Sequence, residues 1–333
     1  MNGDIEVLGC DVGYYGVKLA VRRLGSIETE FFPSVAVRKL RSSLTATTEL
    51  FASQKATIEI PVGDSTFVVD TASDSIAGSR IARAETDNFP LEEEYVALVL
   101  ASLAKLRARN VRRLVLGLPL HNMRHAGFVK QRFEGRHDLG EHGSCTVERV
   151  AVIPQPLGAL AYLRATVPAA SMHDTTVCLI DSGWHTSDLI TAEGGTRLDL
   201  ARSAGRPGGA AIVVREIARL VSESLGERVD NLDRIDRALR IKKPLNLFGK
   251  SVDLEPFVRD AIHVTYPIVK ALITVVGTCE DLAVYSTGGA ARFYVDALRR
   301  TLGFEVHTVD RPQVANAIGF LLAGETAMTA RRF

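Results

Sequence analysis

The sequence has no excess of charge that would point to nucleic acid or to an anionic membrane surface. Its 40 lysine and arginine residues face 39 aspartate and glutamate residues, which leaves a formal net charge of +1. No apolar run approaches the roughly 18–20 residues that a membrane-spanning helix needs. The four cysteines show no CxxC and no short Cys/His spacing, which argues against a zinc site and a disulfide framework. We therefore expect a soluble protein of the reducing cytoplasm with no direct contact to nucleic acid or membrane.

What the sequence does contain is an alternation of strand-like and helical segments over 333 residues. A chain longer than about 250–300 residues usually divides its core, so two domains are expected. The alternation predicts an α/β sheet protein. The predicted strands are 5–11, 17–23, 27–32, 113–118, 146–153, 176–181, 187–192, 197–201, 284–286 and 305–309. The predicted helices are 92–109, 124–133, 157–166, 210–225, 290–302 and 312–322, with most of 230–280 helical around an interruption at 244–254.

The pattern begins again near residue 175, which predicts a duplication. Each half opens with three strands and has an Asp–Gly turn between the first two. We expect a first domain at 1–166 and a second at 167–333, with the last helix crossing back toward the first domain. Residues 34–90 are predicted to form a small inserted subdomain that contains a hairpin about Gly63-Asp64.

The first Asp–Gly turn has the composition of a phosphate-binding loop. Gly13 and Gly16 let the backbone approach a phosphate and present its N–H groups, and Lys18 can pair with β and γ oxygens. Asp11 is then left to orient a hydrated magnesium ion. An ordinary hairpin that uses glycine for positive φ shows the same pattern, so this turn alone does not decide between the two interpretations.

The second turn, at 181–188, adds a second acid. Thr186 offers a hydroxyl group, and the turn at Gly183 offers further N–H groups for a γ-phosphate. Two such turns that face each other can clamp a phosphate chain and its metal ion from both sides. Gly288-Gly289 is a third candidate contact, because a chain without side chains can lie flat against a purine or its ribose. Taken alone, a strand-to-helix turn that needs glycine explains this pair more simply.

Five segments of the chain fall in a characteristic order. They are Asp11-x-Gly13…Lys18, Pro154-Gln155, Asp181-x-Gly183-x-x-Thr186-x-Asp188, Ser286-Thr287-Gly288-Gly289-Ala290 and Ala315-Asn316-Ala317-Ile318-Gly319-Phe320. This order resembles the phosphate 1, connect 1, phosphate 2, adenosine and connect 2 motifs of the actin/Hsp70/sugar-kinase superfamily, over nearly the whole chain. The opening DVGYYGVK, the following FFPSVA and the ANAIGF segment look most like bacterial actin-like plasmid segregation proteins of the ParM/StbA type.

The resemblance implies an actin-like, ribonuclease H-like fold of two duplicated domains with a nucleotide cleft between them. It implies ATP or GTP with Mg²⁺, and it makes Asp11 and Asp181 the catalytic acids that face the metal through water. Gln155 takes the position of the residue that orients the attacking water. Many prokaryotic relatives carry Glu there, and because an amide cannot take a proton from water, we expect slow hydrolysis. The residues implied at the nucleotide are Gly13, Tyr14, Tyr15, Gly16, Lys18, Ser182, Gly183, Trp184, Thr186, Gly208, Glu216, Gly288, Gly289 and Ala290.

The function that the resemblance implies is that of a cytoskeletal ATPase, which assembles into filaments with ATP and hydrolyses it to destabilise them. Its partners would be further copies of the chain and a DNA-binding adaptor that links the filament to a plasmid. Segments 155–165 and 313–322 would be helices about which the domains hinge, with small residues such as Gly158 and Gly319 at their contact. Two alternatives remain open, a small-molecule kinase of the same fold and a non-polymerising nucleotide-gated binding or adaptor protein. For Glu216 a solvated helix face is the simpler interpretation, and the roles of Trp184 and His185 stay open.

Overall fold

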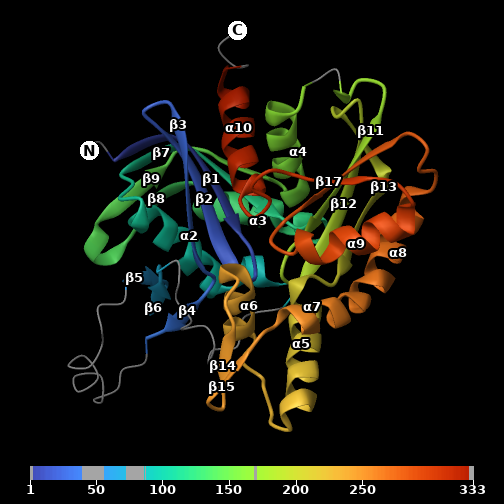
Figure 1. Cartoon of the computed structure of the whole chain (residues 1–333). Coiled ribbons are helices and arrows are strands. Elements are labelled where there is room, and N and C mark those ends of the chain that lie inside the picture. Colours follow the sequence, from blue (N-terminus) through green and yellow to red (C-terminus); the bar gives the residue numbers. More distant parts are fainter. Residues whose placement is uncertain (1–2, 40–55, 73–85, 87, 169–170, 330–333) are drawn as a thin grey trace. The chain divides into compact units, whose positions relative to one another are not determined.

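The computed structural model describes residues 3–39, 56–72, 86, 88–168 and 171–329. Contacts between residues divide the chain into two compact units. The first consists of Met1–Leu118, Asn122–Ile153 and Phe320–Phe333, and the second of Pro119–His121 and Pro154–Gly319 (Figure 1). The boundary between the two predicted domains, at residues 166 and 167, stays a prediction. By its contacts, helix α4 (Gln155–Thr166) belongs to the second unit.

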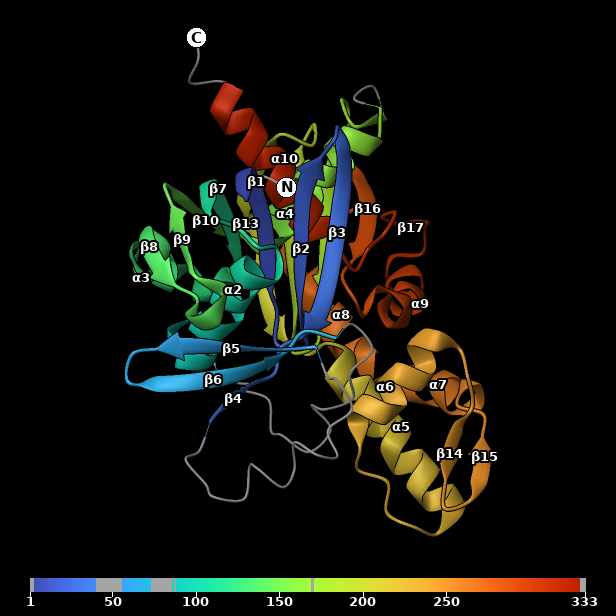
Figure 2. The same ribbon diagram turned by 90° about the vertical axis from the view of Figure 1, so that its left-hand side faces the viewer.

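The first unit is built on a mixed sheet with the strand order β3-β2-β1-β7-β9-β8, and β10 also pairs with β7. β1, β2 and β3 form an antiparallel meander, and β7 runs parallel to β1 (Figure 2). The strands are β1 (Asp4–Val12), β2 (Gly16–Arg23), β3 (Ser26–Pro33), β7 (Asn110–Leu118), β8 (Gly135–Asp138), β9 (Ser144–Val147) and β10 (Val150–Pro154).

Among the described residues, the helices that accompany this sheet are α2 (Glu93–Lys105), α3 (Ala126–Phe133) and the part of α10 (Ala315–Thr329) that begins at residue 320. Helix α2 has acids in its first turn and a lysine in its last, as the helix dipole favours. Its buried face includes Tyr95, which packs against the ring of Phe133 from α3. Short 3₁₀ turns lie at η2 (Phe89–Leu91), η3 (Leu120–His125) and η4 (Gly140–His142). Among the described residues no helix is both long enough and apolar enough to cross a membrane.

The expected subdomain at 34–90 contains a three-stranded sheet of order β4-β6-β5. Its strands are β4 (Ala36–Arg38), β5 (Thr57–Val62) and β6 (Ser65–Asp70). The hairpin about Gly63-Asp64 is confirmed, since Val62 pairs with Ser65 across it (Figure 2). The rest of the segment, at 40–55, 73–85 and 87, lies outside the described residues.

The second unit has a five-stranded sheet of order β13-β12-β11-β16-β17. Its strands are β11 (Thr176–Ser182), β12 (Thr186–Glu193), β13 (Arg197–Pro207), β16 (Leu282–Thr287) and β17 (Val306–Thr308). Its helices besides α4 are α5 (Ala210–Leu225), α6 (Leu232–Ile241), α7 (Glu255–Ala261), α8 (Tyr266–Val276) and α9 (Ala291–Leu302), with a 3₁₀ turn η6 (Ile262–Thr265). A separate hairpin is formed by β14 (Leu245–Leu247) and β15 (Lys250–Val252).

The two sheets share one topology, which confirms the duplication predicted from the order of elements. In each, the first three strands of the half form an antiparallel meander and the fourth lies parallel beside the first. Asp11 pairs with Lys18 across the first turn, and Asp181 pairs with Asp188 across the second. The two Asp–Gly turns are therefore equivalent positions of one repeated motif.

Several predicted boundaries were wrong, for local reasons. The strand expected at 146–153 is two strands, because the exposed Glu148 and Arg149 interrupt it. β13 extends six residues beyond the expected end at 201, to Pro207, because an edge strand tolerates proline and polar residues. The interruption expected at 244–254 holds the β14–β15 hairpin, and α10 begins at residue 315 rather than 312 and continues to 329 rather than 322.

Two hairpin turns place a large apolar residue in the left-handed backbone region. Leu24 (φ 49°) precedes Gly25 between β2 and β3, and Phe248 (φ 47°) precedes Gly249 between β14 and β15. Two-residue hairpins of this kind prefer Asn-Gly, because a left-handed conformation costs other residues roughly 1–2 kcal/mol. Leu24 is fully exposed and Phe248 is 59% exposed, so the described residues leave most of both side chains in contact with solvent.

Candidate functional site

The first Asp–Gly turn is held by hydrogen bonds inside the first unit. The Gly13 N–H donates to Gly16 O at 3.2 Å, and the Ser34 hydroxyl donates to Gly13 O at 2.6 Å. The buried Asp11 accepts from the Lys18 ammonium at 3.1 Å. A phosphate at this turn would therefore meet a lysine that is already positioned by the acid across the hairpin.

The neighbouring tyrosines do not have equal exposure. Tyr14 is buried and stacks on Phe89 with a ring separation of 5.3 Å, while its hydroxyl donates to Thr86 O. Tyr15 is half-buried and stacks on Phe31. At Tyr14, contact with a ligand is thus limited to the backbone.

The second turn has the same backbone geometry inside the second unit. The Gly183 N–H donates to Thr186 O at 2.9 Å, and the burial pattern from Asp181 to Thr186 matches that from Asp11 to Gly16. The start of α5 is attached to this turn, since Ala210 N–H donates to Gly183 O at 2.9 Å and Gly208 N–H to His185 O at 2.7 Å. The structure thus brings Gly208 to the turn, and its role at the nucleotide stays a prediction.

The glycines before α9 contact the same turn. Ala290 N–H donates to Ser182 O at 2.9 Å, and Gly288 has a φ of +88°. A Cβ atom at Gly288 would overlap the Asp181 carboxylate and lie 2.8 Å from the Ser182 carbonyl carbon. A Cβ atom at Gly289 would meet nothing within 4 Å. The predicted phosphate 2 and adenosine segments are therefore in direct contact, with Gly288 at the point of closest approach.

Asn316 is a site residue that the sequence analysis left without a role. Its amide nitrogen donates to Asp181 Oδ2 at 2.7 Å, and its amide oxygen accepts from the Ala159 N–H at 3.2 Å. It is only 7% exposed, so the bonds are well shielded from water. This single side chain fixes the acid and joins the beginnings of α10 and α4. The available signal was an amide in the otherwise apolar ANAIGF segment.

Asp188 is a second buried acid, for which no separate role was predicted. It is the cross-strand partner of Asp181, and its Oδ1 has no hydrogen-bond partner among the residues that the structure describes. Burial, together with the charge of Asp181, raises the pKa of Asp188 to about 8, although a hydrogen bond from the Leu120 backbone acts in the opposite direction. A Cβ atom at Gly205 would overlap Asp188 Oδ1, so the opposing strand makes room for this carboxyl group by carrying glycine.

The raised pKa of Asp188 predicts a pH-dependent stability for the chain without nucleotide or metal. A free Asp has a pKa of about 3.9, so between about pH 4 and pH 8 the folded chain holds one proton that the unfolded chain has lost. The free energy of unfolding should therefore fall as the pH rises through this window, by up to about 1.4 kcal/mol per pH unit.

Urea unfolding of Asp188→Asn and of the unmodified chain at pH 5 to pH 8 measures this contribution. We expect the difference between them to favour Asp188→Asn increasingly as the pH rises. Asp296→Asn, at an exposed carboxyl group, should follow the unmodified chain. Parallel profiles for all three proteins would contradict the prediction.

The acids of the second turn fit a hydrated divalent cation. Magnesium is usually bound by one or two carboxylates and keeps several of its waters. Asp181 supplies a buried carboxyl group at the turn, and Asp188 lies at the same register position on the neighbouring strand. Within the described ranges no three His, Cys, Asp or Glu side chains gather to hold a metal ion directly. These acids therefore suit a metal ion that they hold through its bound water molecules.

Three further residues predicted at the site are Gln155, Trp184 and Glu216. Gln155 is the first residue of α4 and is half-buried. Trp184 is only 8% exposed, which leaves little of its ring for a neighbouring subunit. Glu216 is bound through both oxygens by Arg219, which lowers its pKa. This ion pair on the surface of α5 accounts for Glu216 without a ligand, and its role at the nucleotide stays a prediction.

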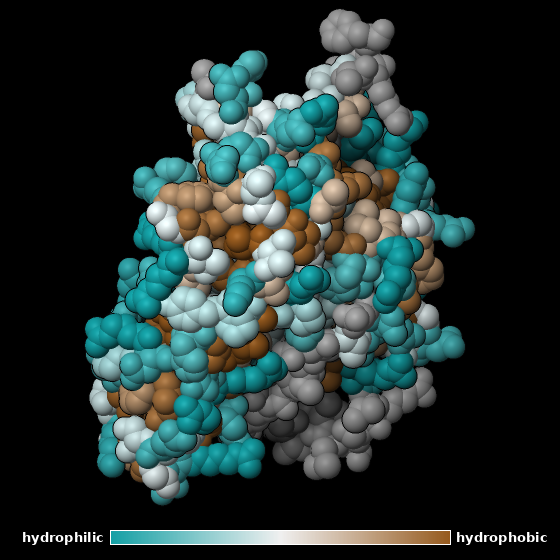
Figure 3. Space-filling model, turned by 90° about the vertical axis from the view of Figure 1, so that its right-hand side faces the viewer, coloured by the Kyte–Doolittle hydropathy of each residue, from teal (hydrophilic) through white to brown (hydrophobic). Residues whose placement is uncertain are grey.

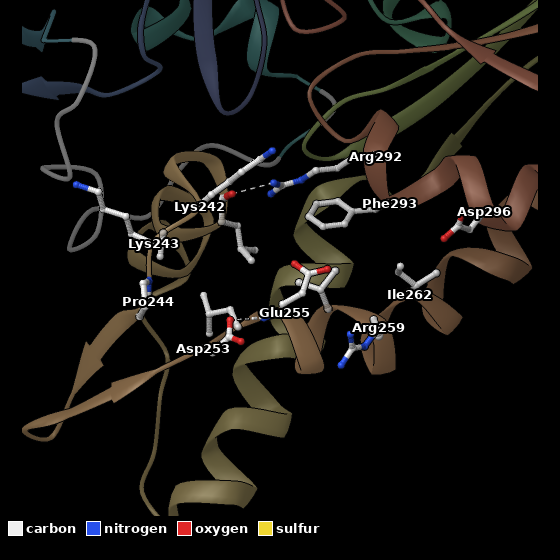
Figure 4. A pocket seen from close by; sticks show the side chains of 14 residues that line it. Lys242, Lys243, Pro244, Asp253, Glu255, Arg259, Ile262, Arg292, Phe293 and Asp296 are labelled. Atoms are coloured by element: carbon white, nitrogen blue, oxygen red, sulfur yellow. Dashed lines mark hydrogen bonds between the residues drawn. The ribbon is translucent and has the colours of Figure 1, made fainter.

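A cavity of about 530 Å³ lies in the second unit among α6, α7 and α9 (Figure 4). Its apolar wall includes Leu239, Val258 and Phe293. Arg292 extends along the α9 side of the cavity, where it donates to Leu239 O at 3.0 Å and lies over the Phe293 ring. The charged residues that line it are Lys242, Lys243, Asp253, Glu255, Arg259, Arg292 and Asp296. α9 begins directly after the glycines that contact the acid-bearing turn.

Comparisons with known proteins agree with this architecture. Residues 9–158 match the family model described as "Actin like proteins N terminal domain". No curated protein matches the chain at a significant level. The archaeal actin homolog Ta0583 superposes with a TM-score of 0.75 at 19% identity, over 97% of this chain and 100% of that one.

Two bacterial actin-like structures are similarly close. A ParM filament from Clostridium botulinum has a TM-score of 0.74 at 19% identity, over 98% of this chain and 100% of that one. The actin-like protein Alp7A has a TM-score of 0.76 at 12% identity, over 99% and 98%. The predicted actin-like fold is thereby confirmed. Over nearly its whole length, the chain has the fold of the archaeal and bacterial actin homologs.

Proposed function

We propose that the chain is a filament-forming ATPase of the ParM type, which binds a nucleoside triphosphate with Mg²⁺ and couples its hydrolysis to assembly and disassembly. The observation that carries this proposal is the contact between Asp181, Gly288 and Asn316 at one glycine turn. It joins three segments that are distant in sequence around a buried carboxylate. Such a group suits a phosphate chain and its metal ion.

The residues at the two turns and at the start of α4 would have separate roles in nucleotide binding and hydrolysis. Asp11, paired with Lys18, and Asp181, held by Asn316, would face the metal ion through its bound waters. Lys18 and the N–H groups of both turns would bind phosphate oxygens. Gln155 would orient the attacking water without taking its proton, so hydrolysis should be slow. A bound metal ion would supply charge neutralisation on the phosphates.

Similar structures support nucleotide binding and assembly. Ta0583 has been solved in complex with ADP, and that structure has a TM-score of 0.70 at 18% identity, over 97% of this chain and 100% of that one. The Clostridium botulinum ParM is a 15-stranded filament. By extension, we propose that this chain binds further copies of itself and a DNA-binding adaptor, in the cytoplasm, and serves plasmid segregation.

The cavity beside α9 supports a site for the base and ribose. Its volume of about 530 Å³ exceeds that of a nucleoside, and its mixture of apolar wall and charged rim suits a heterocycle. Arg292 lies over Phe293 at 4.5 Å and could stack on a base in the same way.

The test is sedimentation and light scattering of the purified chain with Mg²⁺ and either ATP or GTP. We expect polymer with one of the nucleotides, none without it, and phosphate release that needs no added acceptor. Asp181→Ala should raise the concentration needed for assembly at least tenfold, while the unliganded variant stays folded. Absence of polymer from the unmodified chain across a broad concentration range would refute the filament. Phosphate release that requires a small-molecule acceptor would instead support the kinase alternative.

A further inference from the structure

The β14–β15 hairpin presents an aromatic side chain, Phe248, that the described residues leave more than half exposed. Leu245 and Leu247 of this hairpin are buried, and Arg234 donates to Asn246 O at 2.7 Å, so the hairpin is fixed to α6. Phe248 lies beyond these contacts at the tip, 59% exposed and in a left-handed conformation that disfavours phenylalanine. A fixed hairpin that exposes an aromatic residue at an energetic cost is a typical contact point.

A second exposed apolar feature lies on β13, the edge strand of the sheet in the same unit. Leu198 and Leu200 are 38% and 72% exposed, and Leu200 falls in a bulge where the pairing with β12 shifts. Edge strands are usually protected by charges or by a covering element, because they invite pairing with another chain. Figure 3 shows apolar side chains, in brown, gathered over the upper half of the face that it presents.

These two features lie at opposite ends of the second unit. Leu198 is near the start of β13, whose far end, at Gly205 and Pro207, pairs beside the acid-bearing turn. α5 begins at that turn and runs away from it for about 24 Å, at 1.5 Å per residue, toward α6 and the hairpin (Figure 1). Phe248 therefore cannot reach the Leu198–Leu200 edge of its own chain.

We propose that Phe248 docks against the β13 edge at Leu198 and Leu200 of a second copy of this chain. A tip at one end and its receiving surface at the other form a heterologous contact, which can repeat without closing and so generate a filament. The contact rests on the proposed function, since it assigns residues to the self-association that the function requires. It buries the two exposed apolar surfaces and covers the exposed bulge.

Phe248→Asn tests the contact with opposite effects on folding and assembly. Asn-Gly is the preferred dipeptide of this turn, so the variant should unfold at the same temperature as the unmodified chain or higher. Its affinity for nucleotide should stay within about twofold, whereas the concentration needed for assembly should rise at least tenfold. Phe248→Leu, which keeps an apolar side chain in the same conformation, should assemble within about threefold of the unmodified chain.

Mixing experiments test the direction of the contact. Phe248→Asn keeps the receiving edge, so when added in equal amount it should bind the Phe248 end of growing polymers and lower the polymer mass. Leu200→Glu should also fail to assemble, and should lower the polymer mass by binding the opposite end. Unchanged assembly by Phe248→Asn or Leu200→Glu would overturn the contact alone. Absence of polymer from the unmodified chain would overturn both the contact and the proposed function.

Discussion

Gly319→Ala is expected to destabilise the protein by roughly 2–4 kcal/mol, or to prevent folding altogether. Gly319 lies in the first turns of α10, and a Cβ atom there would overlap Gly158 O and lie 2.9 Å from Gly158 Cα. The neighbour is backbone of α4, which cannot rotate away as a side chain can. The two helices would have to separate, and the Asn316 bonds to Asp181 and to Ala159 would lengthen with them.

Gly127→Ala is the matched control for this prediction. Gly127 is an exposed residue within α3, and a Cβ atom there would meet nothing within 4 Å. Alanine is favoured over glycine inside helices by up to about 1 kcal/mol, so this variant should be slightly more stable. Urea unfolding of both variants is the measurement. A Gly319→Ala protein as stable as the unmodified chain would show that α4 and α10 do not approach as closely as described.

Gly288→Ala is expected to reduce the rate of nucleotide hydrolysis about 100-fold, because the reacting groups would be displaced by about an ångström. The added Cβ would overlap the Asp181 carboxylate and the Ser182 backbone, at a residue whose φ of +88° already excludes alanine without strain. Either the turn or the strand end that carries Asp181 must move.

Gly289→Ala is the matched control for Gly288→Ala, because it adds the same methyl group next to the turn without touching the Asp181 carboxylate. Its Cβ would project into open space, so the variant should match the unmodified chain in thermal stability. Gly288→Ala should unfold several degrees lower even without nucleotide. Steady-state phosphate release and thermal unfolding of both variants give the comparison. Equal stability and equal rates for the two would refute the assignment of Gly288 as the residue that supports Asp181.

The parts of the fold and site that could be predicted are those with local causes. The glycine turns at Gly13 and Gly183 are signalled by an acid, two flanking apolar runs and the turn residues themselves, all within about ten positions. The close contact between Gly158 and Gly319 was expected from small residues in both segments and is confirmed. The short polar strand β8 was missed because its residues, GRHD, have no apolar alternation.

The rest depends on contacts between residues far apart in the chain. Asn316 is 135 residues from Asp181, and no periodicity links the two. The raised pKa of Asp188 follows from burial and from the charge of Asp181 across the strand pair, and a linear pattern contains neither. Phe248 was not singled out because phenylalanine before glycine has no special meaning until its backbone conformation and exposure are known.

The way α10 is shared has a consequence for attempts to dissect the protein. Residues up to Gly319 group with the second unit, while the next turns return to the first, where Gly324 approaches Val7 and Val115, and Glu325 binds Arg22. No single uninterrupted stretch of the gene encodes either unit. A fragment ending at residue 153 would lose the helical segment that covers these two valines. The first unit is therefore better studied as such a fragment together with an added peptide of residues 315–329 than as the fragment alone.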